Sequence, residues 1–579
     1  MGIKSITPSQ VLNSNGDPTI KVTMVAENGV AAYFTVPSGA SLGSQEVAQK
    51  TDGTDSYNGK SVNDIIKLIA GVVAPKFIGY PIGHQSDFDS LLVALDGSEN
   101  KRNLGGNTIL AMSGAYFKLS AKLSQKPLWQ YIAEDRKTNP TFPRIFANLV
   151  GGGKHAPGLD IQEFMIVPKS IKPIEAIEQI VQTFHTLTTI MVSLYGPGAQ
   201  LSGSEGAIAP IGASTEVVLE ALSNLNAKNG KTFEIALDVA ANSFFDGKNY
   251  NFEGQSIHAS DLLAVYQGWD SKFDLYSIED PFAEADLEGT ELLKTMPKDK
   301  KPFKVIADDY TVTNASLIAE FSKDKLFDGI IIKPDQVGSI SEMFAAIDAA
   351  KQAGLDIIVS HRSGESNDDF IVDLAYGIGA AGIKIGAPNH GERIAKYNRL
   401  LEIQYSLNSS QEQLDSTLEL DQKPAATPID SMGIKTATMA KPTPVEKLPT
   451  EVATAAPTEA VEDAATPKIT ASEPIVFAST PAQPSESLAL PAQPSQVSQI
   501  GAVPAPVATE MAPAEPSQPM TPIISHVVTN PPEAPMPTLP KEQEMPSGSS
   551  IKNATIALTP IARIAQENSS TAVPPVSGL

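Results

Sequence analysis

The chain has 579 residues, a net charge of −23 and no cysteine. This length exceeds one domain, and the lack of cysteine excludes disulfides and thiolate chemistry and fits a cytoplasmic protein. The acidic balance argues against nucleic-acid binding, and no apolar run reaches the ~18–20 residues that a transmembrane segment needs. The first residues also lack the apolar stretch of a secretory signal.

Residues 1–135 are predicted to form an α+β domain. Residues 19–25 and 31–36 alternate between apolar and polar side chains, as strands do, and Asn28-Gly29 between them indicates a hairpin turn. Helical patterns follow over residues 61–69 and 107–123. The second is rich in small and apolar residues, so we expect it to pack against the sheet.

Residues 136–408 show a different rhythm, in which short apolar runs end in a polar residue and are followed by helical patterns. The steps between successive run ends are 41, 29, 25, 28 and 23 residues, about one strand and one helix each. Buried strands that alternate with helices predict a parallel sheet, and six such units predict a (β/α) barrel closed by a helix over residues 392–405. The runs end at Asp238, Glu279, Asp308, Lys333, His361 and Lys384.

Barrel enzymes carry their chemistry at the carboxyl ends of the strands, where these six residues are predicted to lie. Any one of them is as easily a solvated loop residue, but six in succession indicate a site. Asp238, Glu279 and Asp308 together form an oxygen-only set that suits a hard cation such as Mg²⁺. Lys333 and Lys384 would face that cation, which would lower the lysine pKa and make a general base available.

Residues 409–579 are predicted to be a disordered tail. They hold 27 of the 45 prolines but only one of the 35 aromatic residues, Phe477, and they carry a net charge of −10. Such a composition cannot build a core. A helix over residues 559–566, with Pro560 at its first position, is a candidate binding segment for an unknown partner, although a transient helix without a role is the simpler interpretation.

Six motifs follow one another along residues 5–408. They are Val-Pro-Ser-Gly-Ala-Ser at 36–41, Asp-Ile-Gln-Glu-Phe-Met-Ile at 160–166, Ser-Ile-Glu-Asp-Pro-Phe at 277–282, Ala-Asp-Asp at 307–309, Ser-His-Arg-Ser-Gly-Glu at 360–365 and Ile-Lys-Ile-Gly-Ala-Pro at 383–388. In these motifs and their order, the chain resembles the enolase (phosphopyruvate hydratase) family, whose superfamily is known for a lysine base combined with Mg²⁺. The resemblance implies an N-terminal α+β domain followed by a modified (β/α)8 barrel.

The resemblance also implies the reaction, the reversible dehydration of 2-phosphoglycerate to phosphoenolpyruvate and water with two Mg²⁺. It assigns Lys333 as the base that takes the C2 proton and Glu205 as the general acid, with Glu163 beside it. One of two crowded carboxylates can keep a proton at neutral pH. The family ligands of one Mg²⁺ correspond to Asp238, Glu279 and Asp308, and Ser41 would help to bind the second.

The remaining implied roles concern substrate binding. Arg362 and Ser363 would bind the phosphate, Lys384 would neutralise the substrate carboxylate, His155 would close over the substrate, and His361 would line the site. Lys333, Glu163, Glu279 and Asp308 would also contact the substrate. The partners implied are this substrate and further copies of the chain, in a homodimer or larger homo-oligomer.

The sequence departs from the family pattern at Asn15, Leu42, Ser204, Ala207 and Ile385. Asn15 replaces an arginine often tied to subunit contacts, and Ser204 replaces an aspartate beside the acid. The Mg²⁺ ligands and both lysines are kept, so we predict an active enzyme. The alternatives are a scaffold protein with weak catalysis, acting through its tail, and another superfamily reaction. The Arg362-Ser363 pair disfavours the latter.

Overall fold

The computed structural model describes residues 1–40, 43–296 and 302–421, with side chains up to residue 409. The residues outside these ranges include Ser41 and Leu42, most of the predicted tail and the predicted helix over residues 559–566. Those three expectations therefore lie outside the described residues.

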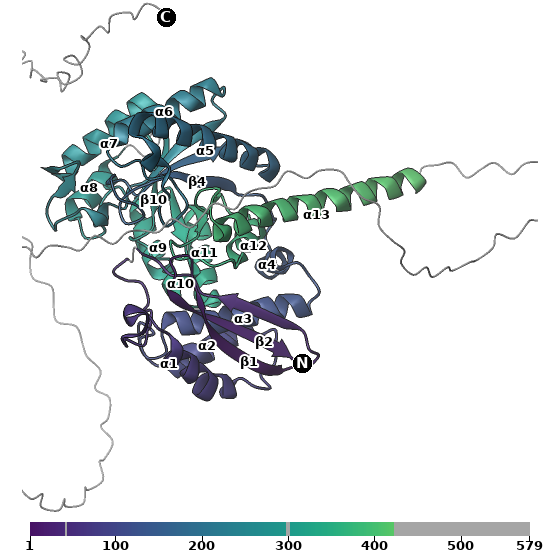
Figure 1. Ribbon diagram of the computed structural model, residues 1–579. Helices are drawn as coiled ribbons and strands as arrows, with labels where there is room; N and C mark the ends of the chain where they lie inside the picture. The colour runs from purple at the N-terminus through teal and green to yellow at the C-terminus, as the bar shows by residue number, and fades with distance from the viewer. Residues whose placement is uncertain (41–42, 297–301, 422–579) are drawn as a thin grey trace, which may run out of the picture. The chain divides into compact units, whose positions relative to one another are not determined.

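The N-terminal part is an antiparallel sheet covered by helices (Figure 1). The predicted hairpin is present, because β2 pairs with β3 through Met24 and Ala32. Helix α3 packs on both strands, and glycine at 114 allows the close approach, since a Cβ there would lie 2.4 Å from the Phe34 ring. The elements are β1 (Ile3–Leu12), β2 (Pro18–Ala26), β3 (Ala31–Thr35), η1 (Ser56–Gly59), α1 (Asn63–Leu68), η2 (Ile69–Val73), η3 (Ala74–Lys76), α2 (Gln85–Asp96), α3 (Gly106–Leu123) and α4 (Leu128–Arg136).

The second part is a closed eight-stranded barrel, in the order β10-β11-β12-β13-β4-β5-β6-β9. The six strands predicted from the repeating runs pair in parallel, as expected. Strand β5, which lies outside those runs, is antiparallel to both of its neighbours. Since β4 pairs in parallel with β13, β5 is the one strand of the described barrel that runs in the reverse direction. The strands are β4 (Arg144–Gly151), β5 (Glu163–Pro168), β6 (Phe233–Asp238), β9 (Leu275–Glu279), β10 (Lys304–Ala307), β11 (Gly329–Ile332), β12 (Asp356–Ser360) and β13 (Gly382–Lys384).

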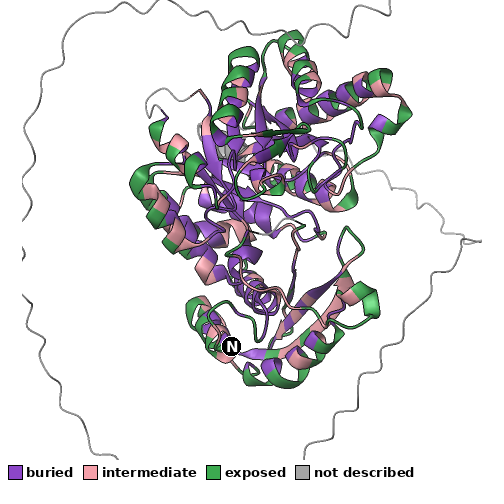
Figure 2. Cartoon of the chain, turned by 90° about the vertical axis from the view of Figure 1, so that its left-hand side faces the viewer, coloured by how far each residue is buried: buried purple, intermediate pink, exposed green. Residues whose placement is uncertain are grey.

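Helices cover the outside of the barrel, with their buried faces toward the strands and their exposed faces outward (Figure 2). A small hairpin of β7 (Tyr250–Phe252) and β8 (Gln255–Ile257) lies between β6 and β9 in the chain. The helical segments are α5 (Pro173–Tyr195), η4 (Pro197–Gln200), α6 (Thr215–Lys228), η5 (Ala241–Ser243), α7 (Ala259–Phe273), α8 (Leu287–Thr295), α9 (Ala315–Phe321), η6 (Ser322–Asp324), α10 (Pro334–Val337), α11 (Ile340–Ala353), α12 (Phe370–Ile378) and α13 (Gly391–Asp421).

Helix α13 corrects the predicted start of the tail. It runs to Asp421, past the predicted helix end at residue 405 and the predicted tail start at residue 409. Residues 411–421 are mostly good helix formers, and the next proline after Pro388 is Pro424. The change in composition near residue 409 therefore does not mark the end of regular structure.

The barrel interior is filled by one layer of apolar side chains, which closes it as a core. Side chains two residues further along a strand point to the same side. This puts the inward-facing positions of the next layer at Asn148, Glu163, Asp238, Asp308, Lys333 and Ser360. The apolar layer contains Phe146, Met165, Val167, Ala236, Ile306, Ile331 and Ile358.

Candidate active site

The strand ends bring the predicted residues together at one end of the barrel. Glu163 at the start of β5 pairs with Asp238 at the end of β6, which in turn pairs with Glu279 at the end of β9. Because β5 is reversed, its first residue, Glu163, lies at the carboxyl end of the other strands. Asp308, Lys333 and His361 each follow directly after a strand, and Lys384 ends β13.

The ammonium group of Lys384 lies among three buried carboxylates. Its Nζ is 3.2 Å from Glu163, 3.1 Å from Asp238 and 2.8 Å from Glu279. Burial, and then the charge of Asp238, raise the pKa of Glu279 well above its ordinary value. The three carboxylates thus surround the positive charge of Lys384.

Lys333 contacts the carboxylate of Asp308. Burial alone would lower the pKa of Lys333, but Asp308 outweighs burial and raises it. This direction is opposite to the one expected for a lysine beside bound cations. Asp308 also accepts a hydrogen bond of 3.0 Å from Gln336, and its backbone N–H donates to Asp280 at 2.9 Å.

Glu163 and Glu205 form the expected crowded pair, with His155 between them. His155 Nδ1 lies 3.9 Å from Glu163 and Nε2 lies 3.5 Å from Glu205. Burial and the charge of Glu205 raise the pKa of Glu163 well above its usual range. Burial also disfavours the charged form of Glu205, but the neighbouring His155 and His361 rings and the Arg393 guanidinium outweigh burial and lower the pKa of Glu205. The pKa values of the pair are split, but the raised pKa belongs to Glu163 and not to Glu205, the residue expected to be the acid.

Residues 37–40 form a loop that lines one side of the site. Ser38 pairs with Gly364, and the Ala40 N–H donates to Ser363 Oγ at 2.7 Å. The cavity beneath this loop measures about 20 Å³, room for about one water molecule. The cavity is lined by Gly39, Ala40, His155, Gln162, Glu163, Glu205, Asp238, Asp308, Lys333, Ser360, His361, Arg362, Ser363 and Lys384.

The guanidinium of Arg362 is buried beside the same loop. It lies 3.3 Å from Glu46 and 3.4 Å from Asp335. Burial opposes its charge, but Asp335 and Glu46 outweigh burial and raise the pKa of Arg362. Two carboxylates therefore hold this cation at the edge of the cavity. Neither carboxylate was predicted from the sequence.

Other residues at the site were also missed. Asn148 donates to Glu205 at 3.1 Å, and Gln162 donates to Asp238 at 3.3 Å. Asn148 carries a usable signal, since it follows the inward-facing Phe146 by two positions on β4. Arg393 in α13 contacts His361, and nothing in its helical pattern marks it as buried.

Four of the five residues that depart from the family pattern lie within the described part of the chain. Ser204 accepts from Arg393 through its backbone carbonyl, and its N–H donates to the carbonyl of His155. Ala207 and Ile385 are both buried. The Asn15 N–H donates to the Asn13 side chain at 2.9 Å, within the turn before β2.

Asp238, Glu279 and Asp308 suit a hard divalent cation. All three are buried carboxylates, and two of them already hold the Lys384 ammonium at close range. Oxygen-only donor sets of this kind favour Mg²⁺ over softer metals. Among the described residues, the groups whose ligand atoms all lie within 4.8 Å of one another are Asp280, Asp308 and Asp309, and His155, Glu163 and Glu205. The predicted trio is not one of these groups, and only its Asp308 belongs to one.

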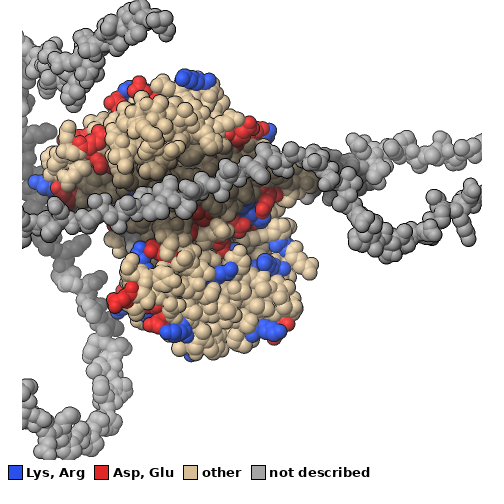
Figure 3. Space-filling view, viewed as in Figure 1, with Lys and Arg blue, Asp and Glu red and all other residues tan. Residues whose placement is uncertain are grey.

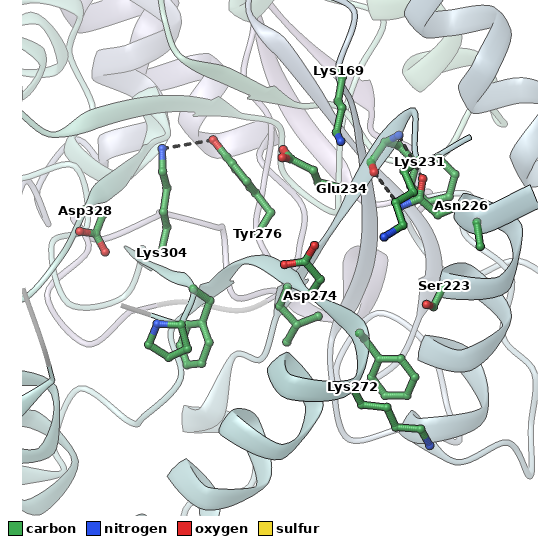
Figure 4. A pocket seen from close by; sticks show the side chains of 16 residues that line it. Lys169, Ser223, Asn226, Lys231, Glu234, Lys272, Asp274, Tyr276, Lys304 and Asp328 are labelled. Atoms are coloured by element: carbon green, nitrogen blue, oxygen red, sulfur yellow. Dashed lines mark hydrogen bonds between the residues drawn. The ribbon is translucent and has the colours of Figure 1, made fainter. Parts of the chain in front are cut away.

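A cavity larger than the one at the site opens at the other end of the barrel, near the start of β6, β9 and β10 (Figure 4). It measures about 480 Å³, and none of the described residues predicted for the site lines it. Two of its lysines have carboxylate partners, since Lys304 lies 2.6 Å from Asp356 and Lys272 lies 2.5 Å from Glu216. Its size therefore does not make it the catalytic site.

Neither sign of charge dominates the face of the molecule shown in Figure 3. Basic and acidic side chains are interspersed on the face shown in Figure 3. Among the described residues, no helix combines the length and the apolar character that crossing a membrane requires.

Comparisons with known proteins agree with this arrangement. Residues 3–132 match the family "Enolase, N-terminal domain", and residues 139–416 match "Enolase, C-terminal TIM barrel domain". Similar proteins named Enolase include those of Methanopyrus kandleri, 37% identical over 71% of this chain and 97% of the relative, and Elusimicrobium minutum, 38% identical over 70% and 96%. The Enolase of Mastigamoeba balamuthi is 36% identical over 72% of this chain and 98% of its own. Because both domains match and the relatives align over nearly their whole length, this chain belongs to the enolase family.

Proposed function

We propose that this chain catalyses the reversible dehydration of 2-phospho-D-glycerate to phosphoenolpyruvate and water, with two Mg²⁺ as cofactors. The observation that carries the proposal is a single buried cavity lined by Lys333, Glu205, Arg362 and Lys384. It combines a candidate base, a candidate acid and two cations for an anionic substrate. Membership in the enolase family supports the same reaction.

Substrate binding is assigned to the cations of the cavity. Arg362 and Ser363 would hold the phosphate, because a guanidinium can donate two parallel hydrogen bonds to paired oxygens. Lys384 would neutralise the substrate carboxylate. Asp238, Glu279 and Asp308 would hold one Mg²⁺, and Ser41 is proposed for the second. The ions would supply the positive charge that stabilises the charge built up on that carboxylate, and Asp308 would then no longer pair with Lys333.

Proton transfer is assigned to Lys333 and Glu205. Lys333 Nζ takes the proton from C2, and the electron pair of that C–H bond moves toward the carboxylate. It then forms the C2–C3 double bond as hydroxide leaves C3 with a proton from the Glu163–Glu205 pair. Crowding keeps one proton on that pair, and His155 and His361 lie 3.5 and 3.4 Å from Glu205 to orient it.

The test follows phosphoenolpyruvate formation by ultraviolet absorbance and C2 proton exchange by NMR in deuterated buffer with Mg²⁺. Lys333→Ala should remove exchange, a loss of about 100- to 10,000-fold. Glu205→Gln should slow dehydration more than exchange. Lys304→Ala, at the opposite end of the barrel, is the matched control and should behave as wild type. A folded protein without dehydration activity would refute the proposal, and equal losses in both assays for Glu205→Gln would contradict its role as acid.

We further propose that the protein acts in the cytoplasm as a homodimer or larger homo-oligomer, as the family resemblance implies. Sedimentation velocity of the full chain tests the oligomeric state. A monomer at all concentrations would contradict it.

A further inference from the structure

Arg393 is the largest fully buried side chain among the described residues, yet it belongs to no role considered so far. It lies in the first turn of α13, with 0% of its surface exposed. Its Nη1 lies 2.6 Å from His361 Nδ1 and donates to the carbonyl of Arg362 at 2.7 Å. Its Nη2 donates to the carbonyls of Ser363 at 2.7 Å and Ser204 at 3.3 Å.

These contacts determine which nitrogen of His361 carries a proton. A guanidinium has only N–H donors and keeps its proton in proteins, so the nitrogen that faces it must accept. Nδ1 of His361 is therefore unprotonated. A neutral imidazole carries its single proton on the other nitrogen, Nε2.

The other side of the ring faces the acid. His361 Nε2 lies 3.4 Å from Glu205 Oε1 and has no hydrogen-bond partner within the described part of the chain. In the opposite tautomer, a lone pair would face the Glu205 carboxylate and an N–H would face the Arg393 guanidinium. Both contacts would then be repulsive.

The ring has little freedom to turn away. A Cβ added at Gly386 would lie 3.0 Å from His361 Cε1 and 3.1 Å from Arg393 Cδ. The groups that face His361 are Glu205, Arg393 and Glu365, and burial is the main reason why the pKa of His361 falls to about 4. The ring is therefore neutral at physiological pH.

We infer that Arg393 is a positioning residue that fixes His361 as the Nε2–H tautomer and so directs that N–H toward Glu205. Because Arg393 also binds three backbone carbonyls, it ties the acid-bearing loop at Ser204 to the phosphate-binding segment at Arg362 and Ser363. His361 then serves only as a hydrogen-bond donor to Glu205 or to a substrate oxygen. It does not act as a base.

The tautomer is measurable in the wild-type full chain by NMR of ¹⁵N-labelled histidine, with His361→Asn used to assign the signal among seven histidines. We expect Nε2 to carry the proton and Nδ1 to be unprotonated throughout the neutral pH range. An Nδ1–H tautomer, or an imidazolium at neutral pH, would overturn the inference. This measurement does not require an active enzyme or a stable variant.

The variants Arg393→Lys and Arg393→Gln test the cause. Arg393→Gln should allow both tautomers of His361 and lower kcat by about 10- to 100-fold. Arg393→Lys keeps one cationic donor, so it should retain more of the Nε2–H tautomer and more of the wild-type kcat than Arg393→Gln. Arg399→Gln is the matched control on the same helix, because Arg399 binds Asp373 at 2.8 Å and does not contact His361. A folded Arg393→Gln protein with the wild-type tautomer and rate would refute the assignment.

The effect on kcat rests on the proposed dehydration reaction, whereas the tautomer does not. A protein with the expected tautomer but without dehydration activity would refute only the proposed function. A protein that is active with the opposite tautomer would refute only the role of Arg393.

Discussion

The ammonium nitrogen of Lys384 lies 2.8 Å from Oε2 of Glu279. This buried ion pair accounts for how so acidic a chain can gather carboxylates at one barrel end. Without a cation among them, the carboxylates would repel one another in a medium that screens charge poorly. The pair also predicts what happens when the cation is removed.

Lys384→Met should lower the free energy of unfolding in metal-free buffer by about 3–5 kcal/mol, because it leaves buried carboxylates without a partner. Added Mg²⁺ should restore part of the loss. Urea unfolding measures both effects. Lys294→Met is the control, because its pair with Glu291 is exposed to solvent, which screens the interaction, so this substitution should change stability far less. Equal effects of the two substitutions would contradict the prediction.

His361 should make stability depend on pH in a defined window. Burial lowers the pKa of His361 from 6.5 to about 4 in the folded protein. Above pH 6.5 the ring is neutral in both states, so its full contribution is present. As the pH falls from 6.5 toward 4, His361 becomes protonated in the unfolded chain but not in the folded protein. The free energy of unfolding should therefore fall by about 3 kcal/mol.

The measurement for His361 is the free energy of unfolding of wild type and His361→Asn across this window. The variant lacks the titrating group, and its side-chain oxygen can still accept from Arg393. The wild type should lose stability relative to the variant on acidification. A difference that does not change with pH would show that His361 titrates normally.

Gly39→Ala should weaken substrate binding. A Cβ at this position would lie 1.7 Å from Arg362 Nη2, so either the guanidinium or residues 37–40 must shift. A displacement of this size should lower kcat/KM by about 10- to 100-fold, mainly through KM. Gly71→Ala is the control, because no atom lies within 4 Å of the added Cβ. An unchanged KM would show that this loop does not set the position of Arg362.

Removal of residues 422–579 should leave catalysis nearly unchanged. Every described residue of the site precedes Pro388 in the chain, and the supporting Arg393 lies in the first turn of α13, which continues to Asp421. A chain ending at Asp421 should keep kcat/KM within about two-fold of the full chain. A large loss would show that the removed residues reach the site or a subunit interface.

Much of the site could be predicted because strand ends are visible in sequence. An apolar run followed by a charge identified Asp238, Glu279, Asp308 and Lys333, and parallel strands bring such ends together. The direction of a strand is not visible in this way, since an apolar run reads the same in both directions. The antiparallel β5 was therefore missed.

The supporting contacts were missed for a different reason. Glu46, Asp335 and Arg393 act through partners far away in the chain, and their own surroundings in sequence show ordinary surface or helix patterns. The difference in pKa between Glu163 and Glu205 likewise depends on which groups face each carboxylate. Such assignments require tertiary structure.

The pairing of Glu163 with Asp238 and of Asp238 with Glu279 makes the site sensitive to strand length as well as to residue type. Successive strand residues alternate between the two faces of a sheet, so one residue inserted into β6 would turn Asp238 away from the barrel interior without altering any side chain. Insertions in the connecting loops carry no such penalty. Through this register, the position of the Asp238 carboxylate depends on the length of β6 as well as on the residue at 238.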